Sequence, residues 1–164
     1  MILEQQLERQ IIAAVKTDDE SVYYSGAWSQ TETGDVKGAE SSTTGAVVTV
    51  TVSPRVMDTY GGGVDEVAAD FGVAINCAIS ADADPTGAQM LTLWQSVSSK
   101  VWSWVKNQTS EQTTELTVFD APTNRVIFSP GGVMSNGGTA PTWVAQAHMW
   151  TWSISFTVKG IITE

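Results

Sequence analysis

The sequence predicts an α+β protein in which a mostly antiparallel sheet packs against one long central helix, with a second, amphipathic helix at the N-terminus. Three observations favour this class. Residues 148–158 alternate apolar and polar side chains. Apolar residues recur at three- and four-residue steps over 85–107, and again over 2–16. Alternation is typical of a half-buried strand, and steps of three and four mark one face of a helix.

The composition is that of one globular domain covering residues 1–164. The chain has 164 residues, of which 42% are hydrophobic and 16% charged, as in ordinary folded domains. No apolar run approaches the ~20 residues of a membrane span, and the first ten residues lack the pattern of a signal peptide. We therefore expect a protein that works in a cytoplasm, or in a particle assembled there.

The negative charge is concentrated in one part of the chain. Residues 17–84 hold twelve acidic and two basic residues, 2 − 12 = −10, which equals the net charge of the whole chain. Without an excess of basic residues, tight binding to nucleic-acid phosphates is not expected. DNA would pass such an acidic surface without adhering to it. The alternative is a solvated surface that keeps the protein soluble.

The first part of the chain predicts a helix, a strand and a long polar loop. The apolar face of the helix is formed by Leu3, Leu7, Ile11, Ala14 and Val15. Residues 22–28 predict the strand. Residues 29–45 contain one apolar residue larger than alanine, Val36, so we expect a mobile polar loop or a protruding hairpin there. Loops of this length in compact domains are usually functional or disordered.

Two strands are expected before the long helix. Residues 46–58 alternate valine and threonine, with Pro54 marking an edge or an end. A flexible turn follows at 59–66; its three glycines lack the lysine and hydroxyl residue of a phosphate-binding loop. Residues 71–80 place five apolar side chains on one face. These are Phe71, Val73, Ile75, Cys77 and Ile79.

The long helix is expected to begin at Pro85, with Asp84 as its cap. A calcium site formed by Asp82 and Asp84 is not supported, because the spacing is broken and no closing glutamate follows. The apolar stripe of the helix consists of Met90, Leu93, Trp94, Val97, Val101, Trp104 and Val105.

Trp102 lies off this stripe, on the same side of the helix as Leu91 three turns earlier. An apolar pair away from the buried face is a candidate contact with another chain, so the sequence predicts a subunit interface at Leu91 and Trp102. The alternative is a helix that is buried over most of its circumference.

The C-terminal third predicts a hairpin over 115–130, a flexible loop over 131–140 and the long strand over 148–158. We expect the buried face of that strand to begin at His148 and to continue through Trp150 and Trp152 as core residues. The predicted aromatic core consists of Trp94, Trp104, Trp150, Trp152 and Phe156. A platform for stacking sugars or bases is the alternative; the other face of the strand offers only Ser, Thr, Met and Lys.

The sequence predicts no enzyme, no cofactor and no metal site. Cys77 is the single cysteine, which excludes an internal disulfide and a multi-cysteine zinc site, and its apolar strand indicates a buried structural thiol. His148 is the only histidine, so no second histidine shares a metal with it. Paired acids such as Asp18 and Asp19 lie in a polar segment and indicate solvated surface.

The order of these elements resembles that of the tail-terminator proteins of long-tailed bacteriophages and prophages, which complete the tail and join it to the head. The resemblance rests on the leading helix, on "VAINCAISADADPTGAQMLTLWQSV" at 73–97 and on "MWTWSISFTVKG" at 149–160. It covers nearly the whole chain in order and carries no signature motif. The acidic loop and the triple glycine have no counterpart in it.

The resemblance implies a structural virion protein that forms a ring, commonly of six copies, at the head-proximal end of the tail. Such a ring ends polymerisation of the tail tube and joins the tail to the head. Its partners are copies of itself, the tail-tube protein and head-completion proteins; it is assembled in the host cytoplasm, and DNA passes through it. Our hypothesis is that Glu32, Asp35 and Glu40 face the lumen or a neighbouring ring.

Two alternatives stay open. The first is a tail-tube or other neck subunit of the same particle, which would polymerise on its own. The second is a stand-alone ligand-binding module, which a pocket around His148 and Trp150 would favour.

Overall fold

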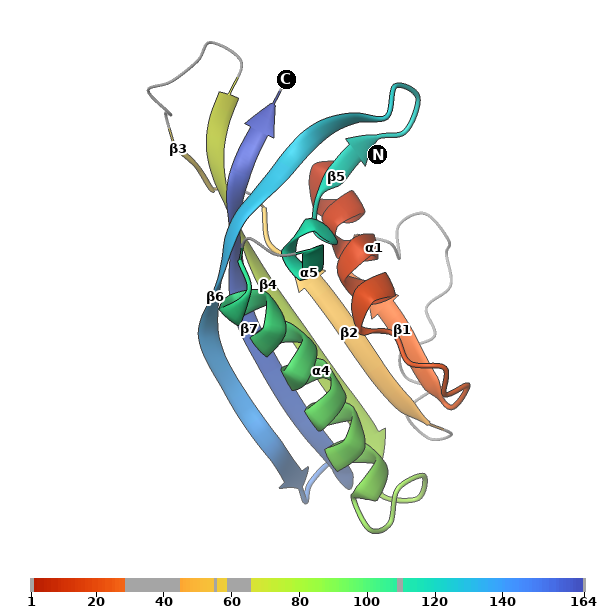
Figure 1. Ribbon diagram of the computed structural model, residues 1–164. Helices are drawn as coiled ribbons and strands as arrows, with labels where there is room; N and C mark the ends of the chain where they lie inside the picture. The colour runs from red at the N-terminus through yellow and green to blue at the C-terminus, as the bar shows by residue number, and fades with distance from the viewer. Residues whose placement is uncertain (1, 29–44, 55, 59–65, 109–110, 164) are drawn as a thin grey trace.

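The computed structural model describes residues 2–28, 45–54, 56–58, 66–108 and 111–163 (Figure 1). The helices are α1 (Leu3–Val15), α4 (Ala88–Lys106) and the short α5 (Glu111–Thr114). The strands are β1 (Val22–Gly26), β2 (Ala46–Val52), β3 (Val56–Asp58), β4 (Glu66–Ser80), β5 (Val118–Asp120), β6 (Arg125–Val144) and β7 (Met149–Thr163).

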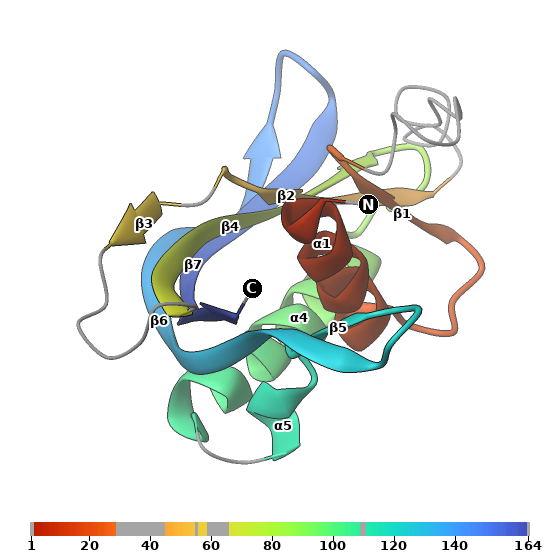
Figure 2. The ribbon, with the colours of Figure 1, turned by 90° about the horizontal axis from the view of Figure 1, so that it is seen from above.

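The strands form one curled, mixed sheet. Six of them follow the order β1-β2-β4-β7-β6-β5, and β3 pairs with β4 off this path. β1 and β2 run parallel, whereas the other pairs are antiparallel. Seen from above, the sheet curls around the helices, which lie on its concave side (Figure 2). The predicted α+β class is confirmed.

Two helices, rather than one long central helix, cover the concave face. α4 contacts β6 and β7, α1 contacts β2 and β1, and the two helices contact each other. The prediction of a single central helix is wrong, because each helix covers a different part of the curled sheet. α4 also begins at Ala88 instead of Pro85. Gly87 stands before it in the left-handed region, with φ 73°, which a right-handed helix cannot contain.

Pairing of β4 with β7 along the whole of both strands forms the centre of the core. The register places Val73 opposite Phe156 and Cys77 opposite Trp152, so that these side chains share the concave face. Trp104 of α4 packs on this face, with its ring centroid 5.8 Å from that of Phe156. Trp104, Trp152 and Phe156 are buried. Trp94 and Trp150 are partly buried against the same core.

The loop expected at 131–140 is instead part of β6. The strand keeps its pairing with β7 through three register shifts, at Pro130/Gly132, Ser135/Gly137 and Thr139/Thr142. Gly137 and Gly138 have φ values of 95° and 153°, which a residue with a side chain rarely adopts. The glycines that suggested a loop therefore allow the strand to bend at its bulges. The hairpin expected just before it is present as β5 and the first residues of β6.

Candidate assembly surface and aromatic hollow

A groove of about 440 Å³ lies between α4 and the middle of β6. None of the side chains that line it is charged. It is lined by Trp94, Ser98, Ser99, Val101, Trp102, Val105, Ser135, Gly137, Gly138, Thr139, Ala140, Ser153 and Ile154. The bends of β6 at its glycines therefore shape one wall of the groove, and the helix supplies the aromatic wall.

The indole of Trp102 stands at this groove and is 64% exposed. Leu91 is 48% exposed. The two are 102 − 91 = 11 residues apart, about three helical turns, so they share one side of α4. The opposite side of the helix carries its buried residues, which are Met90, Leu93, Val97, Val101 and Trp104. Covering the exposed part of the Trp102 indole would contribute about 2–4 kcal/mol.

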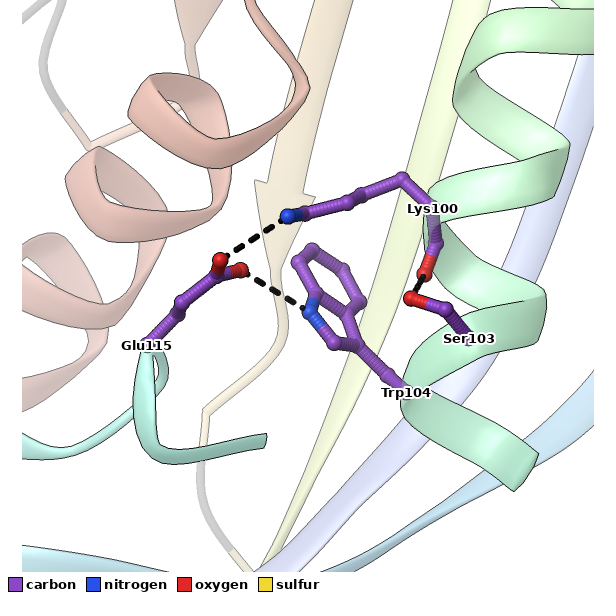
Figure 3. Close-up of polar contacts among 4 residues, drawn as sticks. All are labelled: Lys100, Ser103, Trp104 and Glu115. Carbon is purple, nitrogen blue, oxygen red and sulfur yellow. Dashed lines mark hydrogen bonds and ion pairs between the residues drawn. The ribbon is translucent and has the colours of Figure 1, made fainter. Parts of the chain in front are cut away.

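The C-terminal part of α4, which carries Trp102, is also tied to the segment after α5 by one carboxylate. Glu115 accepts hydrogen bonds from Lys100 Nζ at 2.9 Å and from Trp104 Nε1 at 3.2 Å (Figure 3). Ser103 Oγ donates to the Lys100 carbonyl at 2.9 Å. The Lys100 ammonium also lies 6.0 Å from the centre of the Trp104 ring. This cluster fixes the indole of Trp104.

A second hollow, of about 650 Å³, lies where the β6–β7 turn meets the turn before α4. Its walls are formed by Ala81, Asp82, Pro85, Trp143, His148 and Trp150. Trp143 contacts two other rings, at centroid distances of 5.1 Å to Trp150 and 5.2 Å to His148. We call this site the aromatic hollow.

The expectation that His148 begins the buried face of the last strand is wrong. β7 begins at Met149, and His148 is an exposed turn residue with φ 51°. Its amide donates to the Ala145 carbonyl at 3.3 Å, and its own carbonyl accepts from Ala81 N at 3.1 Å. Because the four-residue turn occupies 145–148, the last strand begins one position later than the sequence pattern indicates.

Trp143 is a member of the hollow that sequence reasoning missed. It lies opposite Trp150 in the β6–β7 register and is 38% exposed. The sequence did contain a signal for a hairpin here, since the four residues between Val144 and Met149 are a common length for a hairpin loop. Pro141 and the preceding glycines concealed it, because they indicate a loop.

The remaining predicted site residues lie elsewhere. Glu32, Asp35 and Glu40 are outside the described residues. Cys77 is buried, and this burial raises the pKa of its thiol to about 12, so the thiol stays protonated and is a poor nucleophile. Within the described ranges, no three His, Cys, Asp or Glu side chains are grouped so as to hold a metal ion. None of the described helices combines the length and apolar character needed to cross a membrane.

No protein-family model matches this chain, and no curated protein matches it in sequence.

Proposed function

We propose that this protein is a structural virion subunit that assembles into a ring at the head-proximal end of a phage tail, ends polymerisation of the tail tube and joins the tail to the head. The observation that carries the proposal is the exposed indole of Trp102 beside a groove without charged side chains. The order of elements described above supports the placement in a tail.

The surface around Trp102 has the character of a contact between protein chains. Exposed large aromatic side chains that cluster with other apolar groups mark interaction sites, and tryptophan is enriched among the residues that dominate interface energetics. Since no charged side chain lines the groove, a partner can cover it without leaving a buried, unpaired charge. Leu91, on the same side of α4 and nearer its N-terminus, adds a second exposed apolar side chain to this surface.

A ring of the proposed kind needs a head-to-tail contact, and the strand order is compatible with one. β1 stands at one end of the order, whereas β6 and β5 stand at the other. The groove lies on the β6 side, so a neighbouring copy that covers it with any part of its β1 side would leave its own groove open for the next copy. Contacts between two different surfaces repeat in this way and produce a ring when the rotation closes.

The charge of the protein suits a channel for DNA. The chain carries a net charge of −10, and a ring of several copies multiplies that charge. A lumen with a negative field repels phosphates and lets DNA pass without adhering.

The test is the mass of the purified protein in solution, measured by sedimentation velocity over a range of micromolar concentrations, with negative-stain images of the same samples. We expect a discrete oligomer and closed rings, and we expect the rings to bind one end of tail tubes assembled from the tube protein of the same genome. A monomer at all concentrations would overturn the proposal, and long filaments would favour a tube subunit.

A matched pair of variants locates the contact. Trp102→Glu places a charge in the groove and is expected to leave monomers. Phe119→Glu makes the same kind of change at a 44% exposed aromatic residue of β5, away from the groove, and is expected to keep the ring. Rings in both variants would show that the contact lies elsewhere.

A further inference from the structure

The aromatic hollow has a chemistry that differs from that of the groove. Three rings stand together at it, because Trp143 contacts both Trp150 and His148. Trp143 is 38% exposed, Trp150 is partly buried and His148 is exposed. The electron-rich faces of aromatic rings attract cations, and tryptophan does so most strongly.

The charge at the hollow has a definite sign. Asp82 is exposed and lies in the wall, and no lysine or arginine is among the lining residues. The adjacent N-terminus of α4 carries a partial positive charge. The carboxylate of Asp84 offsets it by accepting hydrogen bonds from the amides of Gln89 and Met90, at 3.3 and 2.9 Å. The carboxylate of Asp82 therefore gives the hollow a net negative character.

The backbone holds this arrangement in place before any ligand arrives. The amide of Ala81 donates to the carbonyl of His148 at 3.1 Å, which joins the two turns that form the walls. Gly87 leaves room for the Trp150 indole, since a β-carbon at this position would lie 3.2 Å from the ring. The hollow is shallow and wide open to solvent, so it can contact one side of a small group and does not enclose a whole ligand.

We propose that the aromatic hollow binds an organic cation, either a quaternary alkylammonium or a guanidinium group, through cation–π contact with Trp143 and Trp150 and through the carboxylate of Asp82. This binding activity goes beyond the assembly role and uses neither Leu91 nor Trp102. The binding proposal can therefore be tested in either case, on a protein that forms a ring or on one that stays a monomer.

The experiment is a titration of the purified full chain with choline, followed by the indole N–H signals in two-dimensional NMR and by tryptophan fluorescence. The matched control ligand is 3,3-dimethylbutan-1-ol, which has the shape of choline and no charge. We expect saturable shifts with choline, in the millimolar range, and none with the neutral alcohol. Equal binding of both compounds would overturn the proposal and indicate an apolar contact site, and so would an absence of saturation with every cation tried.

Variants connect the binding to the named residues. We expect Asp82→Asn to weaken choline binding by about two- to fivefold, as for an exposed charge pair, and Trp143→Leu to abolish it. Asp120→Asn removes a carboxylate on β5 and should leave binding unchanged. Since Trp143→Leu could disturb the turn, Trp143→Phe serves as a second variant that keeps an aromatic ring and should retain weak binding. Unchanged affinity in Asp82→Asn and Trp143→Leu would contradict the assignment.

A second ligand identifies the source of the cation. Nα-acetyl-arginine methyl ester, whose blocked α-amino group leaves the guanidinium as its only charge, resembles a protein side chain, whereas choline offers the headgroup of a lipid or a free small molecule. Tighter binding of this blocked arginine ester would indicate an arginine side chain of a partner as the natural occupant. Tighter binding of choline would indicate a quaternary ammonium compound.

Discussion

The α-carbon of Gly87 lies so close to the indole of Trp150 that a β-carbon at this position would come within 3.2 Å of the ring. Gly87 also has φ 73°, which costs a residue with a side chain about 1–2 kcal/mol. One glycine therefore allows both the turn before α4 and the position of an aromatic side chain of the hollow.

Gly87→Ala is accordingly expected to lower the free energy of unfolding by about 1–3 kcal/mol, because backbone strain and contact with the Trp150 ring add together. Urea denaturation followed by circular dichroism measures this loss. Gly72→Ala is the control, since a β-carbon there would make only an ordinary 3.5 Å contact with Ser53. A loss no greater at Gly87 than at Gly72 would contradict the prediction.

Asp84→Ala removes the carboxylate that accepts hydrogen bonds from the first turns of α4. The expected loss of stability is about 1 kcal/mol, as for other helix caps. Asp82→Ala, two residues earlier and exposed, should change stability far less. Equal effects of the two substitutions would mean that general charge, rather than capping, is what matters at this turn.

Glu115 is expected to stabilise the protein mainly through the indole of Trp104. Glu115→Ala leaves Trp104 Nε1, in a side chain that is 0% exposed, without its acceptor and should cost about 1–3 kcal/mol. Glu115→Gln keeps an acceptor for the indole and loses only the partly exposed ion pair with Lys100, which is worth about 0.2–1 kcal/mol. Thermal and urea denaturation of the two variants separate these contributions, and a larger loss in the glutamine variant would refute this account.

Burial of the Cys77 thiol should make the stability of the protein fall at alkaline pH. Its pKa is raised by burial from 9.0 to about 12 in the folded protein. Below pH 9 both states carry the proton, so the contribution is fully present. Above pH 9 the unfolded chain ionises first, and stability should fall by about 1.4 kcal/mol per pH unit until the folded pKa is reached. Cys77→Ala should lose this part of the alkaline slope, and a thiol reagent should leave the native wild-type protein unmodified.

Acrylamide quenching is expected to distinguish the tryptophans by their exposure. Trp102 is 64% exposed, whereas Trp104 and Trp152 are 0% and 1% exposed. Trp102→Phe should therefore remove much of the quenchable emission, measured at a concentration where the protein is monomeric. Trp152→Phe should remove emission that acrylamide reaches poorly. If the Trp152 emission proved freely quenchable, the core described here would be wrong.

Sequence reasoning succeeded where the spacing of apolar residues within one helix or strand shows which side is buried. Alternation placed Trp152 and Phe156 on the inner face of the last strand, and the stripe from Met90 to Trp104 predicted the buried side of α4. It also indicated that Trp102 and Leu91 lie off that side. These features follow from one element at a time, so local sequence is sufficient to find them.

The parts that could not be predicted depend on how distant segments meet. Gly137 and Gly138 suggested a loop because nothing local shows that β7 supplies a partner for a bulged strand there. The sharing of the concave face by α1 and α4 depends on the curl of the sheet, which no single segment encodes. A pocket around His148 and Trp150 was considered from the sequence, but Trp143 and Asp82 could not be placed in it, because they are brought there only by two turns joined through Ala81 and His148.

The position of β7 has a consequence for how the molecule is made. β7 follows the other described strands in the chain, yet it lies between β4 and β6 in the middle of the sheet. During synthesis, one edge of β4 and one edge of β6 therefore remain unpaired until β7 has been made. Pairing over such long sequence distances is slow, and exposed strands in the meantime are prone to aggregate. Nascent chains of this protein should therefore depend on chaperones until β7 is complete.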